Sequence, residues 1–133
     1  MRFFLIPILL AYVSVSFADI IRVTILGSGT PRPDINRFSQ SILVEAGEEK
    51  LLFDTGRGSA IRLSQANISV GDIDQIFLTH LHSDHTLGMP DIIMTGWIYQ
   101  RNKVLNIYGP QGTLDFISDI KSAFKKDIEI RVV

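Results

Sequence analysis

Short apolar runs separated by glycine, proline and charged residues predict one α/β domain from residue 20 onward. Each run has the length of a strand, and several alternate apolar and polar positions as a sheet requires. The runs at 41–46 and 50–53 flank Gly47-Glu48-Glu49, which is typical of a β-hairpin. Strands are expected at residues 20–26, 41–46, 50–53, 74–79, 103–108 and 128–133.

Helical spacing occurs in the segments between these strands. Residues 58–66 have a modest helical pattern, and a loop and helix follow residue 86. The last helix lies within residues 114–124 and has an apolar stripe on one face. We expect this stripe to pack in the core. Its members are Leu114, Ile117, Ile120 and Phe124.

Residues 1–18 have the composition of a signal peptide. Met1-Arg2 supplies one positive charge, residues 3–15 are apolar, and Ser16-Phe17-Ala18 offers small residues for cleavage. An uncleaved membrane anchor is the alternative, but the uncharged run is shorter than the roughly twenty residues that a bilayer requires, and Pro7 interrupts it. We therefore expect a leader at 1–18, a mature domain at 19–133, and a periplasmic or secreted protein.

The charge of the mature chain argues against a nucleic-acid partner without excluding it. Residues 1–18 contain one basic residue, Arg2, and no acidic one, so 12 basic and 14 acidic residues remain and the formal charge is −2. The basic residues are scattered, with Lys125-Lys126 the only adjacent pair, whereas nucleic-acid binding usually needs a clustered positive surface. The chain has no cysteine, so disulfides do not stabilise it.

All three histidines of the chain lie in one hexapeptide, His80-Leu81-His82-Ser83-Asp84-His85, directly after the expected strand 74–79. Side chains two apart on extended backbone point the same way, so His80 and His82 face one cation. Ser83 and Asp84 favour a helix start, whose turn brings Asp84 and His85 toward the same space. Imidazoles with a carboxylate are the ligands of zinc, with iron or manganese as alternatives. The hexapeptide therefore predicts a metal site with room for two neighbouring ions. A solvated loop rich in histidine by chance is the opposing interpretation.

Asp54 ends the hairpin in the triplet Asp54-Thr55-Gly56, and its role stays open between two alternatives. A carboxylate at a strand end can accept a hydrogen bond from a ligand histidine, or it can cap the helix that follows. Residues 27–33 fail the dinucleotide-binding pattern, because Arg32 stands where a third glycine is needed, and we expect a shaped turn there.

The order strand, Asp54-Thr55-Gly56, helix, strand and His-x-His-x-Asp-His resembles the metallo-beta-lactamase superfamily. Residues 27–31 with Arg37, and the turn at 108–113, resemble its ribonuclease Z and arylsulfatase branch, and Thr95-Gly96-Trp97 with Arg101 leans toward the exported arylsulfatase-like members. The resemblance implies an α/β fold, a four-layer αββα sandwich in which two mixed sheets pack face to face, with only the amino-terminal half present here.

The same resemblance implies the chemistry of the site. His80 and His82 would bind the first metal, and Asp84 and His85 the second, with zinc the expected ion and two ions in the complete fold. A hydroxide between the cations would attack a small ester substrate such as a phosphodiester or a sulfate ester. Asp84 would orient that hydroxide and is the expected catalytic residue.

The family completes its site with further histidines and a bridging aspartate, and the chain has no histidine after His85. The remaining aspartates of the second half match no family motif and are not assigned. We therefore expect a partial chain or an interrupted gene product, with an uncovered apolar sheet face, a possible homo-oligomer and weak or absent turnover.

Three classes of function remain open. The first is a metal-dependent hydrolase of small esters outside the cytoplasm, which the predicted export favours. The second is a ribonuclease Z-like endonuclease that acts on the 3′ end of transfer RNA. The predicted export and the negative charge of the mature chain both argue against it. The third is an inactive metal-binding remnant, which only the missing ligands support.

Overall fold

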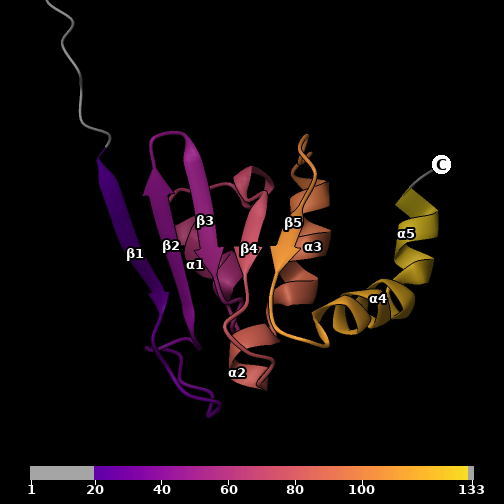
Figure 1. Cartoon of the computed structure of the whole chain (residues 1–133), viewed down its shortest axis with the longest axis horizontal. Coiled ribbons are helices and arrows are strands. Elements are labelled where there is room, and N and C mark those ends of the chain that lie inside the picture. Colours follow the sequence, from indigo (N-terminus) through magenta and orange to yellow (C-terminus); the bar gives the residue numbers. More distant parts are fainter. Residues whose placement is uncertain (1–19, 132–133) are drawn as a thin grey trace, which may run out of the picture.

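The computed structural model describes residues 20–131 and contains one five-stranded mixed sheet (Figure 1). The strands follow the order of the sequence across the sheet. The second strand is antiparallel to the first and the third, and the fourth and fifth run parallel to the third. The strands are β1 (Ile21–Gly27), β2 (Ser41–Ala46), β3 (Glu49–Phe53), β4 (Gln75–Phe77) and β5 (Asn106–Tyr108).

The predicted hairpin forms between β2 and β3. Gly47 has a positive φ of 58°, which glycine adopts without steric cost, and Leu43 pairs with Leu52 across the two strands. Both leucines are fully buried, as is Ile76 on β4. Because side chains alternate along a strand, their neighbours Val44, Leu51 and Phe77 face the opposite side of the sheet.

Helices lie against one face of the sheet, behind it in the view of Figure 1, and close the core there. Helix α1 contributes Ala60 and Leu63, and helix α3 contributes Met89 and Ile92. Arg101 ties the loop after α3 to this layer, since its guanidinium donates to the carbonyls of Val70, Ile73 and Ile92 at 2.8–3.3 Å. The helical segments are α1 (Ser59–Gln65), η1 (Val70–Asp72), α2 (Ser83–Thr86), α3 (Met89–Ile98), α4 (Thr113–Ala123) and α5 (Lys125–Arg131).

The opposite face of the sheet is apolar and uncovered within the described residues. On β1, Val23 is 61% exposed and Ile25 is 67% exposed. Beyond β2, the rings of Phe53, Phe77 and Tyr108 stack across β3, β4 and β5, with centroids 5.1 and 4.9 Å apart. The sheet thus has one face covered by α1 and α3 and one apolar open face, which is the open face that the sequence led us to expect.

The prediction of a strand at 128–133 is wrong over residues 128–131, because the structure has helix α5 over Lys125–Arg131. Residues 132–133 lie outside the described residues. The charged residues here fall at helical spacing: Arg131 Nε lies 2.8 Å from Asp127 Oδ2, and Lys125 Nζ lies 3.9 Å from Glu129 Oε1. No residue of α5 is buried. These pairs between successive turns therefore provide the helix with local support that an isolated strand would lack.

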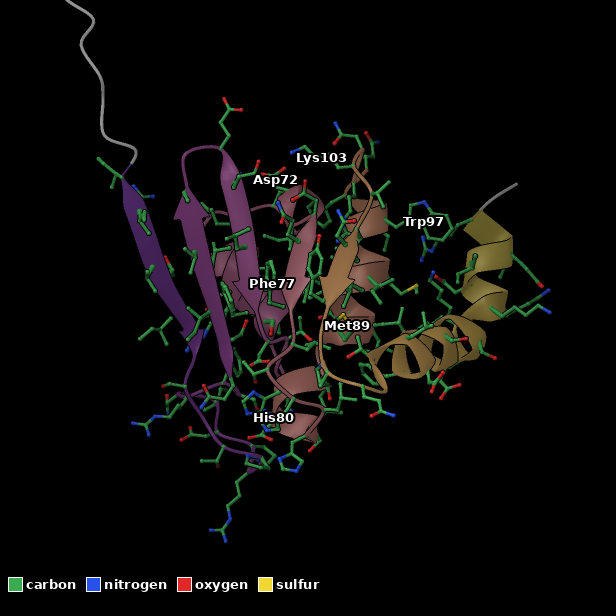
Figure 2. All side chains as sticks on the ribbon, in the orientation of Figure 1. Asp72, Phe77, His80, Met89, Trp97 and Lys103 are labelled. Atoms are coloured by element: carbon green, nitrogen blue, oxygen red, sulfur yellow. The ribbon has the colours of Figure 1, made fainter. Side chains whose placement is uncertain are left out.

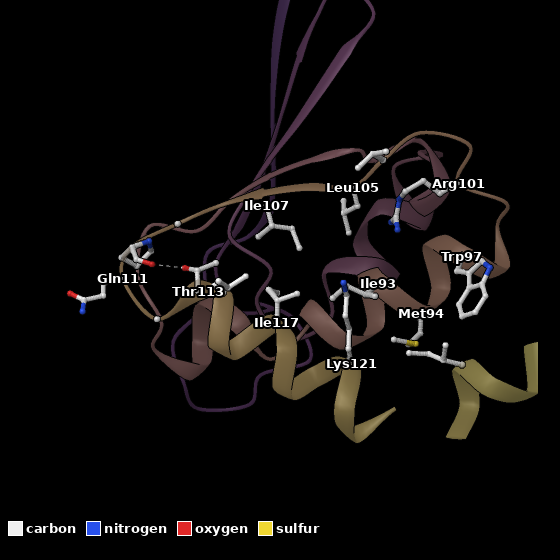
Figure 3. Close-up of a pocket in the computed structure, with 16 residues that line it drawn as sticks. Ile93, Met94, Trp97, Arg101, Leu105, Ile107, Gln111, Thr113, Ile117 and Lys121 are labelled. Atoms are coloured by element: carbon white, nitrogen blue, oxygen red, sulfur yellow. Dashed lines mark hydrogen bonds between the residues drawn. The ribbon is translucent and has the colours of Figure 1, made fainter. Parts of the chain in front are cut away.

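The apolar stripe of α4 is only partly buried in the core, which corrects the expectation that the whole stripe packs there. Ile120 is buried and Ile117 packs against the core, but Leu114 is 83% exposed. Helix α4 lies beyond the β5 edge of the sheet, and a cavity of about 920 Å³ separates it from α3 and β5 (Figures 1 and 3). The stripe therefore faces this cavity as well as the protein interior.

Among residues 20–131, no helix combines the length and the apolar character needed to cross a bilayer. The leader predicted at 1–18 lies outside the described residues.

Candidate metal centre

Three loops meet at the end of the sheet where β3 and β4 finish, near His80 in Figure 2. Because β3 and β4 are parallel, the residues that follow them emerge at the same edge. Backbone hydrogen bonds join the loops: Thr55 N donates to His85 O at 2.8 Å, and Gly88 N donates to Thr55 O at 2.7 Å. Gly56 N donates to Gln40 O at 2.9 Å, which adds the loop after β1. The hexapeptide therefore has a fixed backbone frame.

The three histidine rings lie together at this edge. The centroids of His80 and His82 are 4.7 Å apart with the rings nearly perpendicular, and those of His80 and His85 are 4.0 Å apart. His82 is extended, with φ −64° and ψ 150°, and immediately precedes helix α2, which contains Asp84 and His85. The extended segment and the helical turn thus bring the rings together in the way that the local pattern predicted.

Asp54 lies behind this cluster and settles the choice between its two alternatives. Its Oδ2 accepts a hydrogen bond from His85 Nδ1 at 2.7 Å, and its Oδ1 accepts from Thr79 N at 2.8 Å. Helix α1 begins after Gly58, with no side-chain cap. Asp54 is therefore a hydrogen-bond partner of His85 and not a helix cap. Its φ of 58° is a conformation that aspartate tolerates better than most residues.

Asp84 is positioned by α2 on the same side as His85. One carboxylate oxygen, Oδ2, lies 3.7 Å from His85 Nε2, and the side chain is only 14% exposed. Its backbone carbonyl packs against Gly56 so closely that a Cβ atom at Gly56 would lie 2.5 Å from it. A side chain at position 56 would therefore push α2, with Asp84 and His85, away from the turn.

The donor set suits zinc, although the side chains do not form a closed cage. Two imidazoles bound to one tetrahedral zinc have ring centroids about 5 Å apart, close to the separation of His80 and His82. Within residues 20–131, however, no three His, Cys, Asp or Glu side chains are grouped so as to hold one ion. The ring centroids of His80 and His85, at 4.0 Å, are closer than those of two ligands of one ion would be. The residues fit a metal in the chemistry of their donor atoms, and the side chains would have to move to bind it.

Other aspartates of the second half do not reach this site. Asp91 accepts from Thr95 Oγ1 at 2.7 Å within α3, and Asp127 pairs with Arg131. Asp115 and Asp119 are exposed on α4. Thr79, in contrast, contacts Asp54 and two histidines, and sequence reasoning missed it. Its place directly before His80 was the only signal.

Comparison with protein families identifies the chain. Residues 21–119 match the family described as "Anti-Pycsar protein Apyc1". The chain belongs to this family. The match covers all five strands, the Asp54 turn and the hexapeptide, so the candidate metal centre lies within the matched part of the chain.

Curated proteins similar to this chain include several named ribonuclease Z. Ribonuclease Z of Mycobacterium sp. (strain KMS) is 40% identical over 114 residues, which cover 84% of this chain and 40% of that protein. Ribonuclease Z of Mycolicibacterium gilvum (strain PYR-GCK) is 38% identical over 115 residues, covering 84% and 40%. The chain thus spans about 40% of the length of the curated relatives it matches.

Solved structures confirm the metallo-beta-lactamase fold that the motifs indicated. Human tRNase Z, short form, superimposes with a TM-score of 0.71 at 34% identity, covering 78% of this chain and 39% of that one. The metallo-beta-lactamase fold protein YhfI from Bacillus subtilis has a TM-score of 0.66 at 23% identity, covering 76% and 41%. The described sheet and helices are part of this fold, which is a sandwich of mixed sheets covered by helices.

Proposed function

We propose that this protein provides part of the active site of a metal-dependent phosphodiester hydrolase. The observation that carries the proposal is the convergence of three histidine rings at the ends of two parallel strands, with one ring anchored by Asp54. His80, His82, Asp84 and His85 would hold divalent cations, with zinc the expected ion. The family relationship to proteins named ribonuclease Z favours phosphodiesters over sulfate esters, since RNA is a phosphodiester polymer.

Each residue then has a defined task. His80 and His82, whose ring centroids are 4.7 Å apart, would hold one ion, while Asp84 and His85 would hold a second. When bound, divalent cations lower the pKa of water toward about 7 and polarise the phosphoryl oxygen under attack. Asp84, with its oxygen beside His85, would orient the attacking group as well as bind metal. Asp54 keeps the ring of His85 in place from behind.

Metal binding tests the first half of this proposal. We expect the purified chain to bind zinc in a competition titration with a chromogenic chelator, and H82A to bind it far more weakly. The loss should exceed the roughly 10- to 100-fold typical of changing a ligand's hydrogen-bond partner. D115N is the matched control, because Asp115 is exposed and lies outside the site. Equal affinity in H82A and D115N would exclude the hexapeptide as the metal site.

Turnover tests the second half. We expect slow, zinc-dependent hydrolysis of bis(p-nitrophenyl) phosphate that D84N abolishes and D115N retains, and no hydrolysis of p-nitrophenyl sulfate. Turnover is expected to be slow because no more than four ligands come from the hexapeptide. Zinc binding without any turnover would favour the alternative of an inactive metal-binding remnant.

A ribonuclease Z-like activity on transfer RNA is the second candidate, because the similar curated proteins have that name. The two candidates differ in the substrate that they prefer. Cleavage of a precursor transfer RNA at its 3′ trailer, at protein concentrations that leave the chromogenic diester intact, would favour the ribonuclease.

We also propose that the chain is exported. Residues 1–18 support this with a positive start, an apolar stretch and a small-residue cleavage site. Mass spectrometry of the protein from a bacterial periplasmic extract should find Asp19 as the first residue. An intact Met1 in the cytosolic fraction alone would refute export and strengthen the transfer-RNA candidate.

A further inference from the structure

The hydroxyl of Thr79 lies between one carboxylate and two histidine rings. Its Oγ1 is 2.8 Å from Asp54 Oδ2 and 3.0 Å from Asp54 Oδ1. On its other side, Oγ1 is 3.0 Å from His80 Nδ1 and 3.4 Å from His85 Nδ1. One small side chain therefore connects Asp54 with His80. Among the described residues there is no direct hydrogen bond between Asp54 and His80.

Counting protons fixes the direction of these bonds. A carboxylate only accepts, and a threonine hydroxyl has a single proton, so that proton points to Asp54. The Thr79 oxygen is then left as an acceptor, and His80 Nδ1 must supply the proton of the 3.0 Å contact. His85 Nδ1 likewise donates directly to Asp54 Oδ2. Both neutral rings therefore have their proton on Nδ1 and a free lone pair on Nε2.

We propose that Thr79 is a positioning residue that extends the influence of Asp54 to His80, so that one carboxylate sets the tautomer of two histidines. His85 is oriented by direct contact and His80 through the hydroxyl. That these rings are metal ligands rests on the proposed function, whereas the tautomers follow from the hydrogen bonds alone. A metal-binding imidazole needs its ligating nitrogen unprotonated, so preset tautomers avoid a rearrangement on binding.

The local structure allows a clean test of the hydroxyl. Thr79 is exposed, and its backbone N–H also donates to Asp54 Oδ1 at 2.8 Å. Valine has nearly the same shape and keeps this backbone bond, so T79V removes only the hydroxyl. T79S keeps the hydroxyl and removes only a methyl group. The pair of variants therefore separates hydrogen bonding from packing.

The first measurement is the tautomer of each ring in the full metal-free chain, read from ¹⁵N side-chain chemical shifts. It is made at about pH 8, above the ordinary histidine pKa of about 6.5. We expect both His80 and His85 to be protonated on Nδ1 in the wild-type chain and in T79S. In T79V we expect His80 to shift toward the Nε2–H form, the more common tautomer in water, while His85 keeps its proton on Nδ1.

The second measurement is zinc affinity by chelator competition. We expect T79V to bind zinc roughly 10- to 100-fold more weakly than the wild-type chain, with T79S close to wild type. An unchanged His80 tautomer in T79V, or a T79S spectrum that matches T79V, would overturn the inference. A wild-type chain with the expected tautomers and no affinity for zinc would refute the proposed function and leave the role of Thr79 as an orienting group intact.

Discussion

Substitution of Gly56 by alanine should separate the Asp54 turn from the histidine segment. A Cβ atom at this position would lie 2.5 Å from Asp84 O, 2.6 Å from Gln40 O and 2.7 Å from Gln40 N. All three neighbours are backbone atoms, so no side-chain rotation can make room. The turn, the loop containing Gln40 or the start of α2 must move.

The size of this movement follows from the contact distances. Ordinary van der Waals contact begins at 3.4 Å, so the neighbours must retreat by about 0.7 to 0.9 Å. Overpacking of this kind costs about 1–3 kcal/mol, and weakening the bond from Gly56 N to Gln40 O adds about 1 kcal/mol. At about 4 °C per kcal/mol for a chain of this size, a total of about 2–4 kcal/mol lowers Tm by roughly 8–16 °C.

Thermal and urea unfolding followed by circular dichroism measure the stability loss, and zinc competition measures the effect on the site. G71A is the matched control, because its Cβ atom would lie 2.6 Å from Tyr99 O. Gly71 lies in η1, before β4, whereas the histidines follow that strand. In Figure 2 its neighbour Asp72 and His80 lie at opposite ends of the sheet, so the control is distant from the site. We expect both variants to lose stability and only G56A to lose zinc affinity while still folded.

Two results would refute this reasoning. An unchanged Tm in G56A would mean that the three loops do not hold one another at this contact. Equal zinc affinity in folded G56A and G71A would mean that the position of the turn does not control the histidine cluster.

Three further predictions concern the rest of the molecule. R101M should destabilise the chain by about 2–4 kcal/mol in urea unfolding, because Arg101 donates to three carbonyl groups that would lose their partner, whereas an unchanged midpoint would show that these bonds are dispensable. In α5, the hydrogen bond from Arg131 lowers the pKa of Asp127, so the pair supports the helix at neutral pH and this support is lost as the pH falls through the lowered pKa. The ¹³Cα chemical shifts of α5 should show this loss of helix, and in D127N they should no longer change over the same pH range. The open sheet face should cause self-association at micromolar concentration in sedimentation velocity, and V23K should reduce it by placing a charge on the exposed edge strand; identical sedimentation of both proteins would exclude this face as the contact.

Much of the local structure was predictable from the sequence. The strands at β1, β2 and β3 lie within a residue or so of the predicted ranges, and helix α1 lies inside 58–66. The convergence of His80, His82 and His85 was also predictable, because extended backbone followed by a helical turn determines the directions of neighbouring side chains. Motif order identified the fold, which the similar structures confirm.

Other features needed the tertiary structure. Asp54 and His85 are 31 positions apart, and their contact exists because β3 and β4 pair in parallel, which no local pattern specifies. The role of Thr79 follows from that pairing, since its hydroxyl bonds to Asp54 only when both strand ends meet. The apolar residues of 128–131 suggested a strand, yet no strand of residues 20–131 lies beside them, and the charge pairs one turn apart favour α5. Neighbouring residues thus determined most of the helices and strands and brought the histidine side chains together. The pairing of distant strands decided what holds the histidines in place. The reason is that hydrogen bonds between segments depend on the register of the sheet and not on spacing along the chain.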